Sequence, residues 1–216
     1  MSREGPCIQT SEGGVLYPFD PRVEDFNLRL VAHSLARLSR FTGHTRPLLP
    51  YTVAQHSVVV SLMCDPADAI RALLHDAGEI AFNDVPYPVK QHPAMAFYRE
   101  AEDRFLDVVF EAFGLSPGLP AGLKEVDRRV TATEGGVLLG GLNPEVWGDY
   151  LALYPPYRQD ELDGVRLLPV PADEAFDMFV RRYVAVRLSP GHAPDDVERL
   201  FRWHAGPRLP EDERCW

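Results

Sequence analysis

Histidine and carboxylate side chains that could bind a metal gather in one stretch of the chain, residues 72–90. His75 and Asp76 are adjacent at the end of an apolar run, and Glu79 follows four residues after His75. Residues four apart lie on the same face if a helix continues. Asp84 comes next along the chain. Because ionised groups are costly to bury unless they are paired or bind a metal, this stretch predicts a metal site.

Two further candidate ligands lie on the apolar faces of other predicted helices. His56 falls one turn inside a helix that begins near Thr52, and Asp127 lies on the buried face of a later helix. Each has a simpler interpretation, because a lone buried histidine is usually a satisfied core residue and a buried aspartate can form a salt bridge. Two imidazoles and two carboxylates together suit a divalent transition metal in open octahedral geometry. The four candidate ligands are His56, His75, Asp76 and Asp127.

Basic side chains ahead of these ligands could contact a phosphate group. They are His33, Arg37, Arg40, His44 and Arg46. The first three are spaced by four and three residues, which would place them on one face of a helix predicted over residues 25–41. The other two follow in the next loop. The alternative interpretation is a solvated cationic edge that binds no ligand.

The hydrophobic periodicity predicts helices through most of the chain and hardly any strand. Thr52 and Gln55 form the pattern of a capping box at the start of one helix. Pro86 and Pro88 should end regular structure ahead of Lys90. The predicted helices span about residues 25–41, 52–63, 66–76, 94–113, 121–134 and 172–188.

The length of 216 residues suits one domain with an extension. We predict an all-α domain over residues 1–190, with the metal site within residues 33–135. Residues 191–216 should form a peripheral helical extension at the C-terminus. Residues 135–170, which are rich in glycine and proline, leave three interpretations open: a flap, an oligomer contact or a pair of short helices.

The composition argues against several classes of function. The formal net charge is −10, whereas a general binder of nucleic acid or of a membrane surface would be basic. No apolar run approaches the ~18 residues of a membrane span, and the first residues lack the apolar stretch of a secretion signal. Cys7, Cys64 and Cys215 are widely spaced, without the pairing of a metal site. We therefore expect a cytoplasmic protein with neither nucleic acid nor membrane as its partner.

The order of the candidate ligands resembles that of a known superfamily. An adjacent His-Asp pair alone is a weak signal, but a first histidine, then HDxxE, then a later helical aspartate form a much stronger one. With this pattern the sequence resembles the HD-domain phosphohydrolases over about residues 15–135, more than half of the chain. The resemblance implies an all-α HD-domain helical bundle and a metal-dependent hydrolase of phosphate esters.

Within that superfamily, the runs RFTGHTRPLLPYTVAQHS and ALLHDAGEIAFNDVPYPVK resemble two groups. One group is the bacterial HD-type 5′-deoxynucleotidases, which dephosphorylate deoxynucleoside monophosphates. The other is the phage-type deoxyadenosine triphosphate triphosphohydrolases, which the run LYPFDPRVEDFNLRLVAHSLARLSRFTGH resembles more. The first expectation is therefore a dATP-type triphosphohydrolase that attacks the α-phosphorus. The alternatives are a 5′-deoxynucleotidase and a catalytically silent nucleotide-binding module.

Matched residue by residue, the resemblance implies a role for each candidate. The metal would be held by His56, His75, Asp76 and Asp127. Glu79 matches the acid/base carboxylate, and Asp84 matches a second carboxylate near the attacking water or a second metal. Arg40 matches a substrate-contacting arginine, but Phe41 stands where the nucleotidases have tryptophan. Lys90 matches a basic position that contacts phosphate or supports its neighbours.

The resemblance also implies a cofactor and partners. The cofactor would be divalent cobalt, manganese, zinc or nickel, with magnesium as a further ion. The substrate would be a small deoxynucleotide. Its phosphate tail could meet His33, Arg37, His44 and Arg46, which are candidates by their charge and spacing and not by the resemblance. The chain would form a homo-oligomer, because relatives of this kind tend to assemble into dimers or rings. It would act in the cytoplasm of a bacterium, or of the host cell if a phage encodes it.

Overall fold

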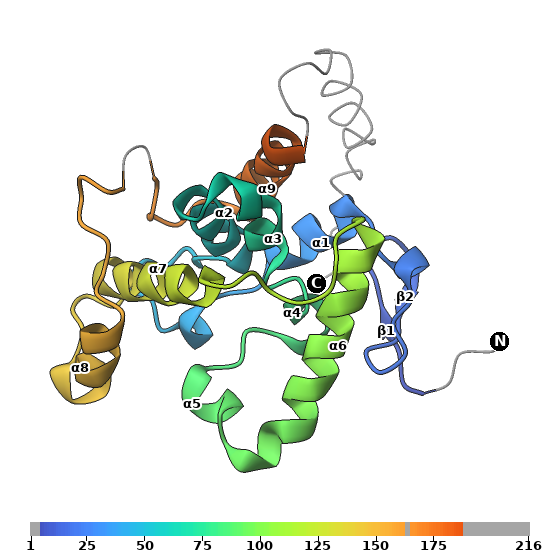
Figure 1. Cartoon of the computed structure of the whole chain (residues 1–216), viewed down its shortest axis with the longest axis horizontal. Coiled ribbons are helices and arrows are strands. Elements are labelled where there is room, and N and C mark those ends of the chain that lie inside the picture. Colours follow the sequence, from blue (N-terminus) through green and yellow to red (C-terminus); the bar gives the residue numbers. More distant parts are fainter. Residues whose placement is uncertain (1–4, 163–164, 188–216) are drawn as a thin grey trace.

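The computed structural model describes residues 5–162 and 165–187, which form a helical bundle with one short hairpin (Figure 1). The predicted all-α fold is confirmed. The helices are α1 (Leu28–Leu35), α2 (Val53–Met63), α3 (Ala69–Leu74), α4 (Glu79–Phe82), α5 (Tyr87–Lys90), α6 (Ala96–Ala112), α7 (Leu123–Leu138), α8 (Pro144–Leu153) and α9 (Ala172–Arg187). The antiparallel strands are β1 (Ile8–Gln9) and β2 (Val15–Leu16). The predicted extension over residues 191–216 lies outside the described residues.

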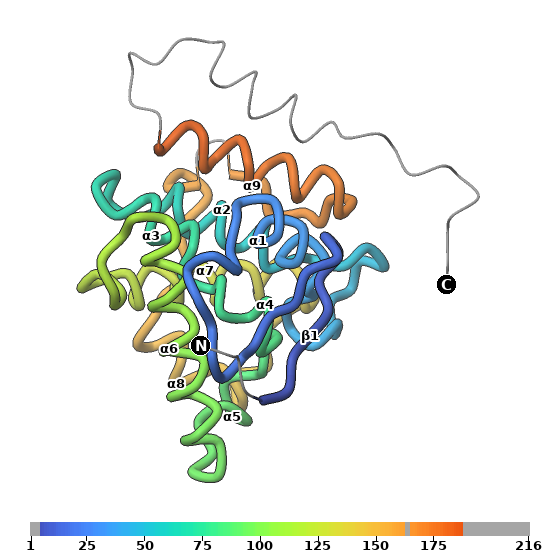
Figure 2. Tube along the Cα trace, turned by 90° about the vertical axis from the view of Figure 1, so that its right-hand side faces the viewer, coloured from blue at the N-terminus to red at the C-terminus, as the bar shows by residue number. Residues whose placement is uncertain are grey.

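Helix α2 is the centre of the bundle. Its residues 53–61 are all buried, as expected for a helix that is apolar on most sides. α3, α7 and α9 pack against α2, and α1 packs against α9 (Figures 1 and 2). This arrangement carries His56, on the second turn of α2, into the interior. None of the helices within the described ranges has both the length and the apolar character of a membrane span.

The helix predicted over residues 25–41 is shorter in the structure. α1 begins after Asn27, whose side chain accepts a hydrogen bond from the N–H of Leu30. His33 lies in α1, whereas Arg37 sits in the turn that follows and Arg40 is extended. The prediction that these three basic residues share one helical face is therefore wrong.

Backbone pairing explains why α1 ends early. The N–H of Arg40 donates to the carbonyl of Tyr51 (2.9 Å), and the N–H of Val53 donates to the carbonyl of Leu38 (3.0 Å). These bonds to the segment ahead of α2 satisfy backbone groups that a longer helix would otherwise pair. As a result the Arg40 side chain is buried, with its guanidinium against α7.

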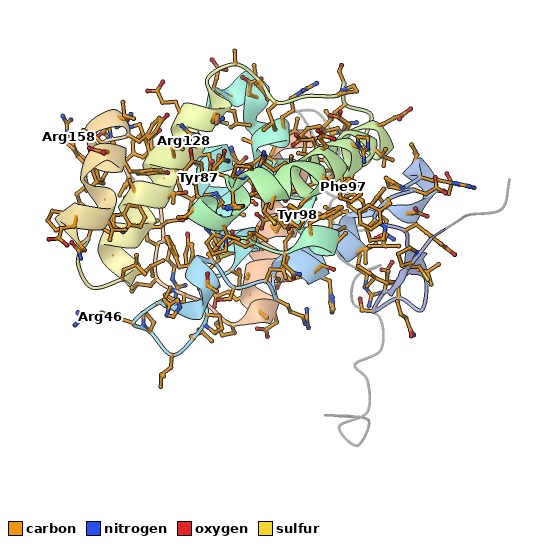
Figure 3. All side chains as sticks on the ribbon, turned by 90° about the horizontal axis from the view of Figure 1, so that it is seen from below. Arg46, Tyr87, Phe97, Tyr98, Arg128 and Arg158 are labelled. Carbon is orange, nitrogen blue, oxygen red and sulfur yellow. The ribbon has the colours of Figure 1, made fainter. Side chains whose placement is uncertain are left out.

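Two other predicted boundaries also change. The prediction that Pro86 and Pro88 end regular structure is wrong, because residues 87–90 form the single turn α5, and proline is tolerated in a first turn. Tyr87 of this turn is seen on the face shown in Figure 3. α7 continues past its predicted end through Gly135, where an added Cβ would lie 3.3 Å from the ring of Trp147 on α8. The glycine therefore allows α8 to approach α7 closely.

The segment between α7 and α9 consists of α8 and an extended stretch. For the described residues this excludes the pair of short helices that the sequence left open. The Gln55 side chain holds the stretch on α2, since it donates to the carbonyl of Leu168 (3.1 Å) and accepts from the N–H of Val170 (3.2 Å). Gln55 therefore does not complete the capping box, of which the Thr52 half forms.

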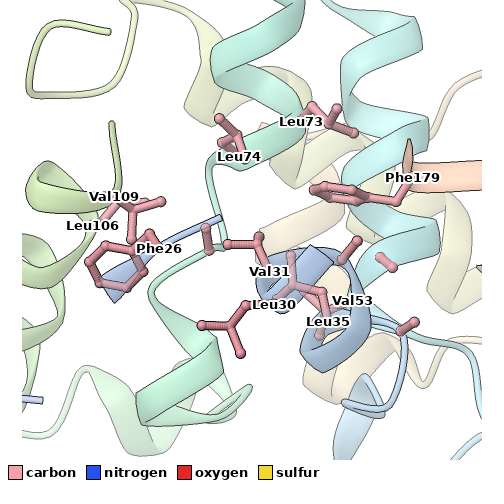
Figure 4. Close-up of a cluster of buried hydrophobic side chains, with 14 of the residues drawn as sticks. Phe26, Leu30, Val31, Leu35, Val53, Leu73, Leu74, Leu106, Val109 and Phe179 are labelled. Atoms are coloured by element: carbon pink, nitrogen blue, oxygen red, sulfur yellow. The ribbon is translucent and has the colours of Figure 1, made fainter. Parts of the chain in front are cut away.

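Two clusters of apolar side chains fill the interior. The larger one lies among α1, α2, α3, α6 and α9 and includes Val31, Leu73 and Phe179, all fully buried (Figure 4). The smaller cluster consists of Val59, Val60, Ala72, Leu123 and Val130. Burial of one large apolar side chain contributes about 1.5–3 kcal/mol. The smaller cluster therefore fixes α3 and α7 against α2, and these are the three helices that carry the candidate ligands.

Candidate metal centre

The four predicted ligands meet in one space between α2, α3 and α7. His56 is fully buried on α2, and His75 caps the C-terminal end of α3 with 7% of its surface exposed. Nε2 of His56 lies 3.0 Å from Oδ1 of Asp127 and 3.6 Å from Oδ2 of Asp76. Nε2 of His75 lies 3.3 Å from Oδ2 of Asp76 and 3.7 Å from Oδ1 of Asp127. The two imidazoles thus direct equivalent nitrogens at the same pair of carboxylates.

His56, His75 and Asp76 could hold a metal ion. One ligand atom from each lies within 4.8 Å of the others. Nε2 of His75 is buried and has no hydrogen-bond partner among the described residues. A buried polar atom left unpartnered costs about 1–3 kcal/mol, and coordination of a cation would remove that cost. The donor types fit a first-row divalent ion.

Hydrogen bonds at Nδ1 set the orientation of both rings. Nδ1 of His75 lies 2.7 Å from the carbonyl oxygen of Ala72, to which it must donate. Nδ1 of His56 lies 2.9 and 3.0 Å from the two carboxylate oxygens of Glu134. With a proton on Nδ1, the Nε2 atom of each ring can offer the lone pair that a metal requires.

Glu134 is the part of the site that the sequence analysis missed. Its fully buried carboxylate accepts a hydrogen bond from Oη of Tyr51 (2.8 Å) and lies 3.4 Å from Nε of Arg40. Thr131, on the same helix, accepts a hydrogen bond from Nη2 of Arg40 (3.0 Å). Asp127, Thr131 and Glu134 follow the spacing i, i+4, i+7 along α7. That spacing is present in the sequence and could have identified Glu134.

The surrounding carboxylates decide the charge of the histidines in the metal-free centre. Burial and the Arg40 guanidinium disfavour protonation of His56, but Glu134 and Asp127 outweigh them and raise its pKa to about 9. Burial alone would raise the pKa of Asp127, yet its hydrogen bond with His56 and the nearby imidazole of His75 hold that pKa well below the usual range. Metal binding must therefore displace protons from the centre.

Arg40 forms part of the wall beside the ligands. Nη1 lies 3.5 Å from Oδ2 of Asp76, and Nε lies 3.4 Å from Oε2 of Glu134. Its Cζ stands 5.6 Å from the centre of the Phe41 ring. The guanidinium thus forms ion pairs with two carboxylates of the protein and neutralises part of their negative charge.

Glu79 and Asp84 lie in the segment after α3, close enough to Asp76 and Arg40 for those charges to act on them. Glu79 opens α4 with 5% of its surface exposed, and its Oε2 is buried without a hydrogen-bond partner. Burial, reinforced by Asp76 and Asp84, raises the pKa of Glu79 well above its usual range. Burial also raises the pKa of Asp84, against the opposing effect of Arg40. Glu79 is therefore suited to carry a proton.

Strained backbone flanks both Arg40 and Asp84. Phe41 and Thr42 each have φ of +54°, and Asn83 combines φ of +64° with ψ of 162°. Conformations of this kind cost non-glycine residues about 1–3 kcal/mol each and concentrate at functional sites. The strain therefore supports a functional role for the two side chains that it positions.

Comparison with known proteins places the chain in a family. The sequence matches no protein-family model. It is 30% identical over 176 residues to the uncharacterized protein YfdR of Escherichia coli (strain K12), which covers 82% of this chain and 93% of YfdR. The chain belongs to the YfdR family. It is also 36% identical over 112 residues to an uncharacterized protein of Rhodobacter capsulatus, which covers 49% of this chain and 57% of that protein.

In this member of the YfdR family, Lys90 is turned toward α6. Its Nζ lies 2.5 Å from Oε2 of Glu102, which is 7% exposed. Burial opposes the charged form of Lys90, but Glu102 outweighs it and raises the pKa of the lysine. No pattern in the sequence singles out Glu102, because no helical spacing links it to the other site residues. Its pairing with Lys90 ties α5 to α6.

Three of the four remaining predicted substrate contacts, His33, Arg37 and Arg46, interact with other parts of the protein. Nδ1 of His33 lies 3.3 Å from Oγ of Ser11 in the hairpin turn, and Nη1 of Arg37 donates to the carbonyl of His33 (3.1 Å). Arg46 lies over the glycine that follows α7, where a Cβ on Gly140 would meet Cδ of Arg46 at 2.2 Å. His44 is exposed in the same loop. A substrate role for these four residues stays a prediction.

Proposed function

We propose that the chain is a metal-dependent phosphohydrolase that acts on deoxynucleotides at the α-phosphorus. The observation that carries the proposal is the buried, unpartnered Nε2 of His75, which faces the carboxylates of Asp76 and Asp127. Buried polar atoms normally have partners, and an imidazole held in this tautomer is typical of a metal ligand. The substrate class rests on the resemblance to the HD-domain phosphohydrolases.

We assign metal binding and proton transfer to two different sets of side chains. The ion would be held by His56, His75, Asp76 and Asp127. When bound, a divalent ion supplies Lewis acidity toward a phosphoryl oxygen and a water that is acidic enough to react near neutral pH. Cobalt, manganese, zinc and nickel suit this donor set, with magnesium as a further ion.

Glu79 and Asp84 would move the protons of the reaction. Water attacks the α-phosphorus, the bond from phosphorus to the 5′-oxygen of the deoxyribose breaks, and that oxygen must receive a proton. Glu79, with its raised pKa and unpartnered Oε2, can donate this proton. Asp84 can accept the proton that the attacking water loses. Arg40, beside Asp76, adds positive charge where the phosphoryl oxygens become more negative.

We propose a deoxynucleoside triphosphate of the dATP type as the substrate, which releases a deoxynucleoside and tripolyphosphate. A 5′-deoxynucleotidase is the second candidate, because both reactions break the same bond. Two contacts favour the nucleotidase. His33 contacts Ser11 of the hairpin and Lys90 is paired with Glu102, so neither side chain is free to bind a longer phosphate tail. A catalytically silent module fits less well, since Glu79 and Asp84 are retained beside the ligands.

A substrate screen tests the proposal. The protein would be incubated with each dNTP and dNMP in the presence of manganese, cobalt or magnesium, and the products would be identified. Deoxyadenosine with tripolyphosphate is the expected result, and inorganic phosphate from several dNMPs would support the nucleotidase instead. Asp127→Ala should abolish turnover, whereas Asp149→Ala on the exposed surface of α8 should not. No turnover of any deoxynucleotide by protein with bound metal would contradict an enzymatic role.

We also propose that the chain works as a homo-oligomer in the cytoplasm, with a small deoxynucleotide as its partner. The oligomer and the compartment rest on the resemblance described above. Size-exclusion chromatography with light scattering of the full chain tests the first of these, and a monomer at micromolar concentration would contradict it.

A further inference from the structure

Arg128 differs from the other cations around the candidate metal centre in the charge of its partners. Arg40 is paired with Asp76 and Glu134, and Lys90 is paired with Glu102. The partners that the structure gives the Arg128 guanidinium within the described residues are tyrosines, which are neutral side chains. Arg128 therefore keeps a positive charge that no carboxylate in these contacts neutralises.

The guanidinium of Arg128 is clamped between two helices. Its Cζ lies 4.7 Å from the ring centre of Tyr154, just after α8, and 5.7 Å from that of Tyr87 on α5. Nη1 also donates to Oη of Tyr154. Oη of Tyr150 donates to the backbone carbonyl of Arg128 (3.1 Å). Figure 3 shows Tyr87 and Arg128 side by side on one face of the molecule.

The clamp joins segments that also carry candidate site residues. Arg128 directly follows the ligand Asp127 on α7, and Tyr87 lies in the segment between Asp84 and Lys90. The elements that meet at the guanidinium therefore include α7, which carries Asp127, and α5, which follows Asp84.

The chemistry of this arrangement fits a phosphate group. Arginine presents a rigid, planar fork of N–H donors that matches phosphate oxygens, and stacking on aromatic rings restricts its motion before a ligand binds. The carboxylates of Asp76, Asp84 and Asp127 would repel a highly charged substrate unless cations outside their pairs attract it. A triphosphate carries more negative charge than a monophosphate and gains more from such a cation.

We propose that Arg128 binds the phosphate groups beyond the scissile one and thereby selects nucleoside triphosphates over monophosphates. The inference rests on the proposed phosphohydrolase function, which it extends to the length of the phosphate tail. Tyr87 and Tyr154 are positioning residues that hold the guanidinium in place. Stacking of the substrate's base on these tyrosines is a different hypothesis, which the experiment separates from this one.

Binding of inorganic tripolyphosphate to the metal-loaded full chain tests the proposal without any base present. By isothermal titration calorimetry, Arg128→Gln should weaken tripolyphosphate binding about 10- to 100-fold, as expected for a charge-assisted contact. Arg128→Lys should recover part of the affinity. Arg158→Gln, an exposed arginine paired with Asp160, is the matched control and should bind tripolyphosphate as the parent does. Metal content and thermal unfolding of each variant would verify that it folds.

A second variant addresses the clamp itself. Tyr87→Leu changes a side chain that is 55% exposed, so this variant should fold. It should weaken tripolyphosphate binding about two- to fivefold, the effect expected for one exposed cation–π contact. In turnover assays, Arg128→Gln should raise the KM for a dNTP by a larger factor than the KM for the matching dNMP.

Two results would overturn the inference. One is tripolyphosphate binding that Arg128→Gln leaves unaltered, or that the parent protein lacks. The other is an equal loss of affinity for the deoxynucleoside and for the dNTP in Arg128→Gln. That result would show that the clamp binds the base and not the phosphate tail. Absence of turnover by the parent would contradict the proposed function, whereas the binding measurement would still decide the role of Arg128.

Discussion

The two walls of the candidate metal centre differ in how completely their histidine and glutamate side chains are paired. In the α2–α7 wall, His56, Tyr51 and Glu134 are fully buried and bonded to one another. In the loop wall, residues 75–84, Nε2 of His75 and Oε2 of Glu79 are buried without partners. Packed helices thus determine where the candidate ligands lie, and the unpartnered atoms mark the positions at which we propose a metal and a substrate.

The loop wall is held in place by packing behind it. Phe82 is buried and meets the rings of Phe105 (5.7 Å) and Tyr98 (5.3 Å) edge-on. A Cβ on Gly78 would lie 3.1 Å from Cγ of Glu102, so the glycine allows the turn to rest against α6. Aromatic pairs of this kind are worth about 0.5–1.5 kcal/mol beyond their burial. These contacts can offset the free-energy cost of the strained backbone at Asn83 and of the unpartnered polar atoms in the loop wall.

Glu79→Gln should give the largest effect on the loop wall. The amide keeps the shape but cannot donate the proton of a carboxyl, so kcat should fall about 10²- to 10⁴-fold with metal content retained. Steady-state turnover and metal analysis measure the two quantities. Glu100→Gln, at an exposed position of α6, is the control and should turn over as the parent does. Equal kcat for Glu79→Gln and the parent would remove Glu79 from the mechanism.

Glu134→Gln should act on the α2–α7 wall through the metal and through stability. The amide cannot accept from both His56 and Tyr51 as the carboxylate does and loses the ion pair with Arg40, so metal affinity should fall about 10- to 100-fold. The free energy of unfolding of the metal-free protein should fall by about 1–3 kcal/mol. Metal titration and urea unfolding measure these changes, with Glu125→Gln on the exposed side of α7 as control. Unaltered metal affinity would show that His56 needs no carboxylate behind it.

Substitution of Asn83 should give the smallest effect and tests the strain in the loop wall. Asn83→Gly should raise the free energy of unfolding by about 1 kcal/mol, because glycine adopts φ of +64° without a Cβ clash. Asn83→Ala should lower it, because alanine keeps the Cβ and loses the polar side chain. Urea unfolding of the metal-free protein compares the pair. Equal stabilities would show that the backbone at this position is not strained.

The sequence predicts the parts of the site that depend on local spacing. The helical periodicity around His56, the turn at Asp65 and the end of α3 at His75 bring two imidazoles to one place, as predicted. Asp76 and Asp127 are partly buried beside them, with side chains 20% and 31% exposed, as their positions next to apolar faces predict. The all-α fold is predictable for the same reason, because the apolar stripes repeat with a helical period.

The parts that the sequence does not predict depend on pairing between distant segments. Arg40 leaves its predicted helix because residues 38–40 pair with the backbone ahead of α2. The pairing of Lys90 with Glu102 requires that α5 fold back on α6. The Gln55 side chain hydrogen-bonds to the stretch before α9 and not to the start of its own helix. Local patterns carry no information about these partners, which tertiary packing selects.

Metal titration of the metal-stripped full chain tests the central claim most directly. Calorimetric titration with Co²⁺ or Mn²⁺ should give one ion per chain. His75→Gln should bind the ion at least about 100-fold more weakly, because it removes the buried nitrogen that has no protein partner. His92→Gln, at an exposed histidine, should bind as the parent does. Absence of binding by the parent, or equal affinity in His75→Gln, would contradict a metal centre at His56, His75 and Asp76.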